Sequence, residues 1–218
     1  MRKLFGYDGF LTHASGVVTT FLFTNFLTLI CCIPVITIGG ALAAHQKIMQ
    51  NFVMQNSQPI FKTYFAAFWQ NLGKATVLLL LFLVTTVFLL ADFYCVMLFA
   101  SGVIALILYL VLLVLFVLIL GITACCLSLI VRYENTLGEH LRNCLYLLMS
   151  YPGRILIMSV VAAIPGALFL LYPATFVQLV PVWVFFGISL LVYIQAKLAK
   201  PLFDSMDAIP KEEEHSLV

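Results

Sequence analysis

The sequence predicts an all-α membrane protein, built as a bundle of about five transmembrane helices with two amphipathic helices at the cytoplasmic interface. Of its 218 residues, 64% are apolar and 9% are charged, whereas ordinary soluble domains carry about 25% charged residues. Several apolar blocks are longer than the roughly 18 residues that mark a transmembrane helix. The stretch 131–154 holds a cluster of charges between two uncharged blocks, 93–131 and 155–196, so it must lie in water or at a membrane surface.

The apolar blocks define the order of the elements. The expected transmembrane helices cover residues 16–38, 75–99, 103–131, 155–172 and 176–196. They form one membrane domain over residues 1–203, and an acidic cytoplasmic tail follows at 204–218. Pro34 and the pair Gly39-Gly40 are expected to kink or end the first helix, because proline lacks the amide hydrogen that a helix interior needs.

Two segments between the transmembrane helices are predicted to be amphipathic helices that lie on the membrane surface. In the first, residues 58–72, aromatic and leucine side chains recur on one helical face. These side chains are Phe61, Phe65, Phe68, Trp69 and Leu72. In the second, residues 136–149, Thr136 and Glu139 have the spacing of a capping box, in which each side chain accepts a hydrogen bond from the other residue's amide. Helices of this kind prefer the headgroup boundary of a bilayer.

Lysine and arginine in short loops set the orientation, since cytoplasmic loops carry an excess of both. The two loops that contain the amphipathic segments carry Lys47, Lys62, Lys74, Arg132, Arg142 and Arg154, whereas the links near residues 101 and 174 are uncharged. Both loops and the C-terminus are therefore expected in the cytoplasm. Five transmembrane helices, the interpretation we favour, then place the N-terminus outside, although Arg2 and Lys3 disfavour that side. The alternative is a re-entrant hairpin over residues 16–52, which keeps the N-terminus inside.

Two polar residues are candidates for a role inside the membrane. Asn25 lies on a polar face of the first helix together with several threonines, and this face either bonds within the bundle or lines a path for a solute. Asp92 follows Lys74 by 18 residues, which is about 27 Å of helix. We therefore expect Asp92 near the far boundary of the bilayer, as an interfacial carboxylate rather than a proton relay.

Neither a metal nor a cofactor is predicted. The six cysteines lack the spacing of a zinc site. The pairs Cys31-Cys32 and Cys125-Cys126 could together supply four thiols to Cu(I), but neighbours on a helix point about 100° apart, so packing is the preferred interpretation. No phosphate-binding loop, nucleophile elbow or zinc-protease motif is present, which argues against an enzyme. A net charge of +2 gives no support to nucleic-acid binding.

Several motifs resemble those of the YesL-like bacterial membrane proteins. The most specific are Cys31-Cys-Ile-Pro-Val-Ile-Thr-Ile-Gly39 and the stretch from Arg132-Tyr-Glu-Asn-Thr to Leu141-Arg-Asn143, within a resemblance over residues 3–203. This resemblance implies a multi-pass protein of a bacterial plasma membrane, with a gene close to carbohydrate uptake systems. The family has no assigned activity, so the resemblance implies no catalytic residues.

Two functions remain open from the sequence. The first is an accessory or scaffold component whose partners are the lipid bilayer and a carbohydrate transporter or sensor subunit. Its candidate docking or structural residues are Arg132, Glu134, Asn135, Arg142 and Asn143. The second is a small-solute transporter or channel, with Asn25 and Asp92 lining its path. We expect the accessory role.

Overall fold

Within the residues that the computed structural model describes, 10–56 and 58–207, every regular element is helical. The first half of the chain forms α2 (Phe10–Cys31), the 3-10 helix η1 (Val35–Thr37), α3 (Ile38–Val53), α4 (Ile60–Phe99) and α5 (Gly102–Ile130). The second half forms α6 (Leu137–Ser150), α7 (Pro152–Leu171), α8 (Pro173–Gln178), α9 (Val180–Val182), the π-helix η2 (Trp183–Gly187) and α10 (Ile188–Asp207). The all-α class expected from composition is confirmed.

In the described part of the chain, four helices are long and apolar enough to cross a membrane. These are α4, α5, α7 and the continuous segment Val180–Asp207. The helix α2, Phe10–Cys31, has 22 residues, and its segment Gly16–Cys31 is a shorter apolar helix than these four. The described residues therefore form an all-α membrane protein with four long apolar helices, which correspond to the last four of the five expected spans.

The expected continuous helix over residues 16–38 is not observed. The helix α2 ends at Cys31, and the chain turns through Pro34 and η1 before α3 begins at Ile38. Proline cannot donate the next hydrogen bond of a helix, and it disfavours helical geometry in the residue before it. The sequence located this break, but it did not show that the chain turns back on itself there.

Pairs of side chains show that α2 and α3 form an antiparallel hairpin. Near the turn, Thr28 Oγ1 lies 2.9 Å from His45 Nδ1. Further from the turn, the ring centroids of Phe21 and Phe52 are 5.9 Å apart. The paired positions move backward along α2 while they move forward along α3, which is the pattern of an antiparallel pair. An antiparallel pair of helices is the fold that the re-entrant alternative over residues 16–52 requires.

The helices α3 and α4 cross closely, and two glycines permit the contact. A Cβ added at Gly39 would lie 2.5 Å from the backbone nitrogen of Thr76, and one added at Gly40 would lie 2.8 Å from the side chain of Leu72. Small residues allow membrane helices to approach at such distances. Gly39 and Gly40 were expected to help end a helix, but they lie in the first turn of α3 and set its packing.

The amphipathic segment 58–72 and the expected span 75–99 are one continuous helix, α4, rather than two. Its 40 residues measure about 60 Å, about twice the hydrocarbon thickness of a bilayer. The first half buries Tyr64 and Phe68 against α3, whereas most side chains beyond Val77 are exposed. A single glycine, Gly73, stands at the expected boundary, and an isolated glycine does not end a helix.

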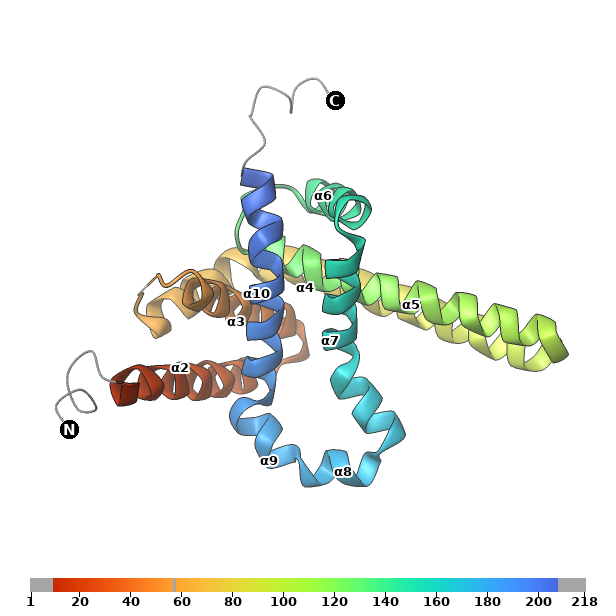
Figure 1. Ribbon diagram of the computed structural model, residues 1–218, viewed down its shortest axis with the longest axis horizontal. Coiled ribbons are helices and arrows are strands. Elements are labelled where there is room, and N and C mark those ends of the chain that lie inside the picture. Colours follow the sequence, from red (N-terminus) through yellow and green to blue (C-terminus); the bar gives the residue numbers. More distant parts are fainter. Residues whose placement is uncertain (1–9, 57, 208–218) are drawn as a thin grey trace, which may run out of the picture.

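Two helical hairpins project from the core in different directions. In Figure 1, α4 and α5 extend together to the right, whereas α7 and α10 run downward and are joined by α8 and α9. Buried side chains such as Leu129, Met158 and Leu202 form the core where α5, α7 and α10 meet. In the most apolar part of α5, no residue is buried. An apolar surface of this size needs lipid or another apolar helix against it.

The last expected span, residues 176–196, is a broken helix, and its C-terminal part is longer than predicted. Short helical segments precede η2, and α10 then continues to Asp207. The first residues of the expected tail over 204–218 therefore belong to α10, while the rest of that tail lies outside the described residues. The second amphipathic helix agrees with its prediction, since α6 begins with the Thr136–Glu139 capping box.

Gln55 is expected to destabilise the end of α3, because its φ of 57° is a left-handed conformation that favours glycine. The Asn56 amide bonds the carbonyl of Asn51 at 2.9 Å, as in the glycine-terminated ends of many helices. Gln55→Gly should raise the free energy of unfolding by about 0.5–1 kcal/mol. Thermal unfolding in detergent would measure it, and Gln55→Ala, which keeps a Cβ, should bring no gain.

Thr136→Ala should cost about 1 kcal/mol of stability, because it removes the N-cap of α6. The Thr136 amide donates to Glu139 Oε2 at 2.7 Å, and this hydrogen bond lowers the pKa of Glu139. The benefit from Glu139 is therefore present above the ordinary carboxyl pKa and is lost as the pH falls through the lowered folded value. Thermal unfolding of Thr136→Ser, which keeps the hydroxyl, should match the parent protein.

Candidate functional site

The loop after α5, residues 131–136, contains three of the five residues expected to dock a partner. Arg132 forms an ion pair with Asp207 at the end of α10, with 2.6 Å between Nη2 and Oδ2. Its guanidinium carbon lies 4.8 Å from the ring centroid of Phe203, and Tyr133 donates to the same carboxylate at 2.7 Å. Burial alone would lower the pKa of Arg132, but its hydrogen bonds with Asp207 and Tyr133 outweigh burial. The net shift of the pKa is upward, so the guanidinium stays charged.

The rest of this loop is bonded to α3 and α4. The Gln70 amide donates to the carboxylate of Glu134 at 3.1 Å, and Lys74 Nζ donates to the carbonyl of Asn135 at 2.9 Å. From α3, Lys47 Nζ donates to the carbonyl of Val131 at 2.7 Å. Arg132, Glu134 and Asn135 therefore make contacts within the chain, and these contacts hold the loop against α3, α4 and α10.

The other two predicted docking residues, Arg142 and Asn143, lie on α6, and no hydrogen bond among the described residues joins them to the loop. Arg142 is exposed and Asn143 is half-buried. The outer face of α6 also exposes Leu145, Tyr146 and Met149. The structure thus divides the predicted set between a fixed polar loop and a helix with a mixed basic and apolar outer face.

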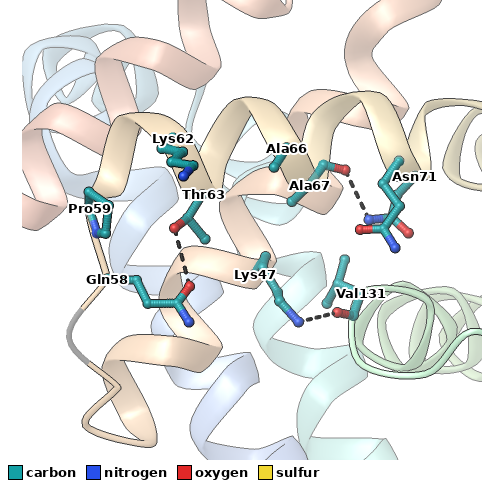
Figure 2. A pocket seen from close by; sticks show the side chains of 10 residues that line it. Lys47, Gln58, Pro59, Lys62, Thr63, Ala66, Ala67, Asn71 and Val131 are labelled. Atoms are coloured by element: carbon teal, nitrogen blue, oxygen red, sulfur yellow. Dashed lines mark hydrogen bonds between the residues drawn. The ribbon is translucent and has the colours of Figure 1, made fainter.

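A cavity of about 390 Å³ opens beside the loop, between α3 and the start of α4 (Figure 2). Lys47 and Lys62 line it, and Figure 2 shows the Lys47 ammonium group reaching the carbonyl of Val131 at its edge. None of the described residues that line this cavity is acidic. Burial lowers the pKa of Lys47, and the charge of Arg132 lowers it further. An anion in this cavity would offset both effects.

A second polar cluster is buried where α2 meets η2 and α10, and Asn25 is its centre. The Asn25 side-chain nitrogen donates to the carbonyl oxygens of Trp183, at 3.0 Å, and Val184, at 2.5 Å. Its Oδ1 accepts a hydrogen bond from the backbone amide of Ser189 at 3.1 Å. A π-helix displaces the regular hydrogen bonds of an α-helix, and Asn25 supplies donors to the carbonyl groups in this segment.

His45 extends this cluster to α3 and α4. Its two ring nitrogens lie 2.9 Å from Thr28 Oγ1 and 3.1 Å from Ser189 Oγ, and the Tyr64 hydroxyl donates to Thr28 at 3.2 Å. All four of these side chains are buried. Sequence reasoning found the polar face of α2 but missed His45, Ser189 and Tyr64. The signal available was that polar face itself, since buried hydroxyl and amide groups require partners on neighbouring helices.

The surroundings of Asp92 differ from those of the polar cluster around Asn25. It is exposed on the projecting part of α4, near the tip of the α4–α5 hairpin. Asn25 is fully buried, and its amide atoms bond to backbone and side-chain groups. The two residues that a conduction path would share are therefore in different environments, and the structure does not bring them together.

The cysteines are distributed between two packing clusters. Cys31 and Cys32 pack against the cluster formed by α2, α3 and α4, whereas Cys125 and Cys126 are buried together with Cys144 of α6. Hydrogen bonds with Cys125 and Cys126, together with burial, raise the pKa of the Cys144 thiol, so it stays protonated. The four thiols of the copper hypothesis are not brought together. Among the described residues, no group of three or more histidine, cysteine or acidic side chains could hold a metal ion.

Comparison with known families relates the first part of the chain to one of them. Residues 17–93 match the family described as "Protein of unknown function, DUF624". The match covers the α2–α3 hairpin and α4 up to Phe93, and so it includes Asn25, His45 and Asp92. No curated protein and no solved structure matches the chain.

Proposed function

We propose that this protein is an accessory or scaffold component that docks a carbohydrate transporter or sensor subunit in a bacterial plasma membrane. The observation that carries the proposal is the fixed loop 131–136, which α3, α4 and α10 hold through four side-chain contacts. A surface that is ordered before binding loses less conformational entropy when a partner docks. The resemblance of residues 31–39 and 132–143 to YesL-like proteins supports the carbohydrate context.

The outer face of α6 supplies the part of this docking surface that recognises the partner. Arg142 can pair with an acidic group, while Leu145 and Met149 offer apolar contacts one and two turns further along the helix. Arginine beside exposed apolar side chains is a common composition for the centre of a protein interface. We therefore assign recognition to α6 and a supporting role to the loop.

For the topology, we propose four transmembrane helices and a re-entrant α2–α3 hairpin. Four spans place both chain ends on one side, and this agrees with Arg2 and Lys3 as well as with the basic loops. The antiparallel pairing of α2 and α3 supports the hairpin. The loop 131–136 and α6 then face the cytoplasm, and the tip near Ser101 faces outward.

A solute transporter or channel is the second candidate, and the separation of Asn25 from Asp92 argues against it. Two measurements distinguish the candidates. Purification in mild detergent should recover a carbohydrate transporter or sensor subunit with the chain, and Arg142→Glu should reduce this recovery at least about tenfold because it reverses a charge at the interface. Arg154→Glu, on α7, is the matched control and should leave recovery unchanged. Solute flux through the purified chain alone in liposomes, without such a partner, would contradict the accessory role.

A further inference from the structure

A second groove, of about 960 Å³, opens where the ends of the α2–α3 hairpin meet α10. Gly16 and Val17 of α2 line one side, and Tyr193 and Lys197 of α10 line another. The connection between α3 and α4 closes the groove with Asn56 and neighbouring residues. The hairpin therefore brings the first turns of α2 next to the end of α3, and the groove exists because of this fold-back.

The polar side of the groove is basic and rich in amides. Lys197 and Lys200 are exposed one turn apart on α10. The amide side chains that line the groove are Asn51, Gln55, Asn56 and Gln58. None of the described lining residues is acidic. Ammonium groups supply hydrogen-bond donors with positive charge, and amides both donate and accept, so this side suits an anion that carries hydroxyl groups.

Apolar and aromatic residues line the rest of the groove. Phe52 and Tyr193 line it, with their ring centroids 5.9 Å apart, and both rings pack on the buried Phe21. Val17 and Ile48 continue this surface. A ligand that fills the groove therefore has a charged part and an apolar part, as an anionic lipid does.

The basic character continues beyond this groove. Gln58 lines it and also lines the cavity that contains Lys47 and Lys62, so the two hollows adjoin. Four lysines, Lys47, Lys62, Lys197 and Lys200, thus line the two adjoining hollows. A cluster of basic residues beside a membrane attracts anionic headgroups, and hollows lined by one sign of charge concentrate counter-ions.

We propose that this groove binds a phosphate group joined to a polyol, with the phosphate at Lys197 and Lys200 and the hydroxyl groups at the amides. Two sources have this chemistry. One is the headgroup of an anionic lipid such as phosphatidylglycerol, whose acyl chains would lie along Phe52 and Val17. The other is a soluble polyol phosphate such as glycerol phosphate. The amphipathic walls favour the lipid.

The test measures binding to the full-length chain in an uncharged detergent. The probes are a short-chain phosphatidylglycerol, a phosphatidylcholine with the same acyl chains, and glycerol phosphate, each followed by native mass spectrometry. The protein should retain phosphatidylglycerol in preference to phosphatidylcholine. The double variant Lys197→Gln and Lys200→Gln should weaken that binding by about tenfold to thirtyfold. Two basic residues beside an anionic headgroup together strengthen its binding by about this factor.

The control is Arg154→Gln, which removes one positive charge from α7, outside the groove, and is compared with the single variants Lys197→Gln and Lys200→Gln. It should bind phosphatidylglycerol as the parent chain does. Lysine-dependent binding of phosphatidylglycerol alone assigns the groove to lipid, and lysine-dependent binding of glycerol phosphate assigns it to a soluble ligand. Equal weakening by Arg154→Gln and by the single lysine variants would reduce the effect to net charge and overturn the proposal. If the protein retained neither phosphatidylglycerol nor glycerol phosphate, the proposal would be overturned as well.

Discussion

Gly39→Ala is expected to destabilise the protein by at least about 2 kcal/mol, the largest effect that we predict for a single added methyl group. The new Cβ would lie 2.5 Å from the backbone nitrogen of Thr76 and 2.7 Å from the carbonyl carbon of Ala75. Backbone atoms cannot rotate away as side chains can, so α3 and α4 must separate. Overpacking of this kind typically costs about 1–3 kcal/mol.

Thermal unfolding in detergent measures this effect, and about 2 kcal/mol corresponds to a fall of about 4–8 °C in Tm for a chain of this size. Gly73→Ala is the matched control, because a Cβ at Gly73 meets open space in the middle of α4. It should stabilise the protein by about 0.5–1 kcal/mol, since alanine is the better helix former. Gly40→Ala should fall between the two, because it meets the flexible side chains of Leu72 and Phe68. Equal Tm values for the three variants would contradict the close crossing of α3 and α4.

Asn25→Ala is expected to cost about 3 kcal/mol. It removes the donors to the carbonyl oxygens of Trp183 and Val184 and the acceptor for the Ser189 amide. Each buried polar group left without a partner costs about 1–3 kcal/mol, and relaxation of η2 toward regular helix would recover part of the total. The loss should appear in Tm and as faster hydrogen exchange of the Ser189 amide.

Asn143→Ala is the matched control for this prediction. Asn143 is half-buried on α6, and no hydrogen bond of its side chain occurs among the described residues. Its replacement should change stability by less than about 0.5 kcal/mol. If Asn25→Ala left Tm and the exchange of the Ser189 amide unchanged, Asn25 would not hold η2 against α2.

The sequence was sufficient where local chemistry decides the structure. Composition gave the helical membrane class, and the capping box at Thr136 and Glu139 located the start of α6. The link at Ser101-Gly102 was also correct, since Gly102 has a φ of 62° at the tip of the α4–α5 hairpin. These features depend on neighbours along the chain, so one sequence contains the information that determines them.

Features that depend on contacts between distant segments were missed. Pro34 showed a break but not the direction of the chain after it, because the pairing of Thr28 with His45 determines the fold-back. Gly39 resembled a helix end, although it permits a helix crossing. Arg132 was expected to face a partner, but its acceptor, Asp207, lies 75 residues further along the chain. Such partners are identified only when the fold brings them together.

Labelling with a membrane-impermeant thiol reagent tests the proposed topology most directly. In a cysteine-free background, single cysteines would replace Gly16, Asn56 and Ser101. The first two lie on the groove at the open end of the α2–α3 hairpin, and the third lies at the tip of the α4–α5 hairpin. The reagent should label Ser101→Cys in intact cells. It should label Gly16→Cys and Asn56→Cys only after the cells are permeabilised. Labelling of Gly16→Cys and Asn56→Cys from opposite sides would contradict the fold-back, and labelling of Asn56→Cys in intact cells would contradict the cytoplasmic docking surface.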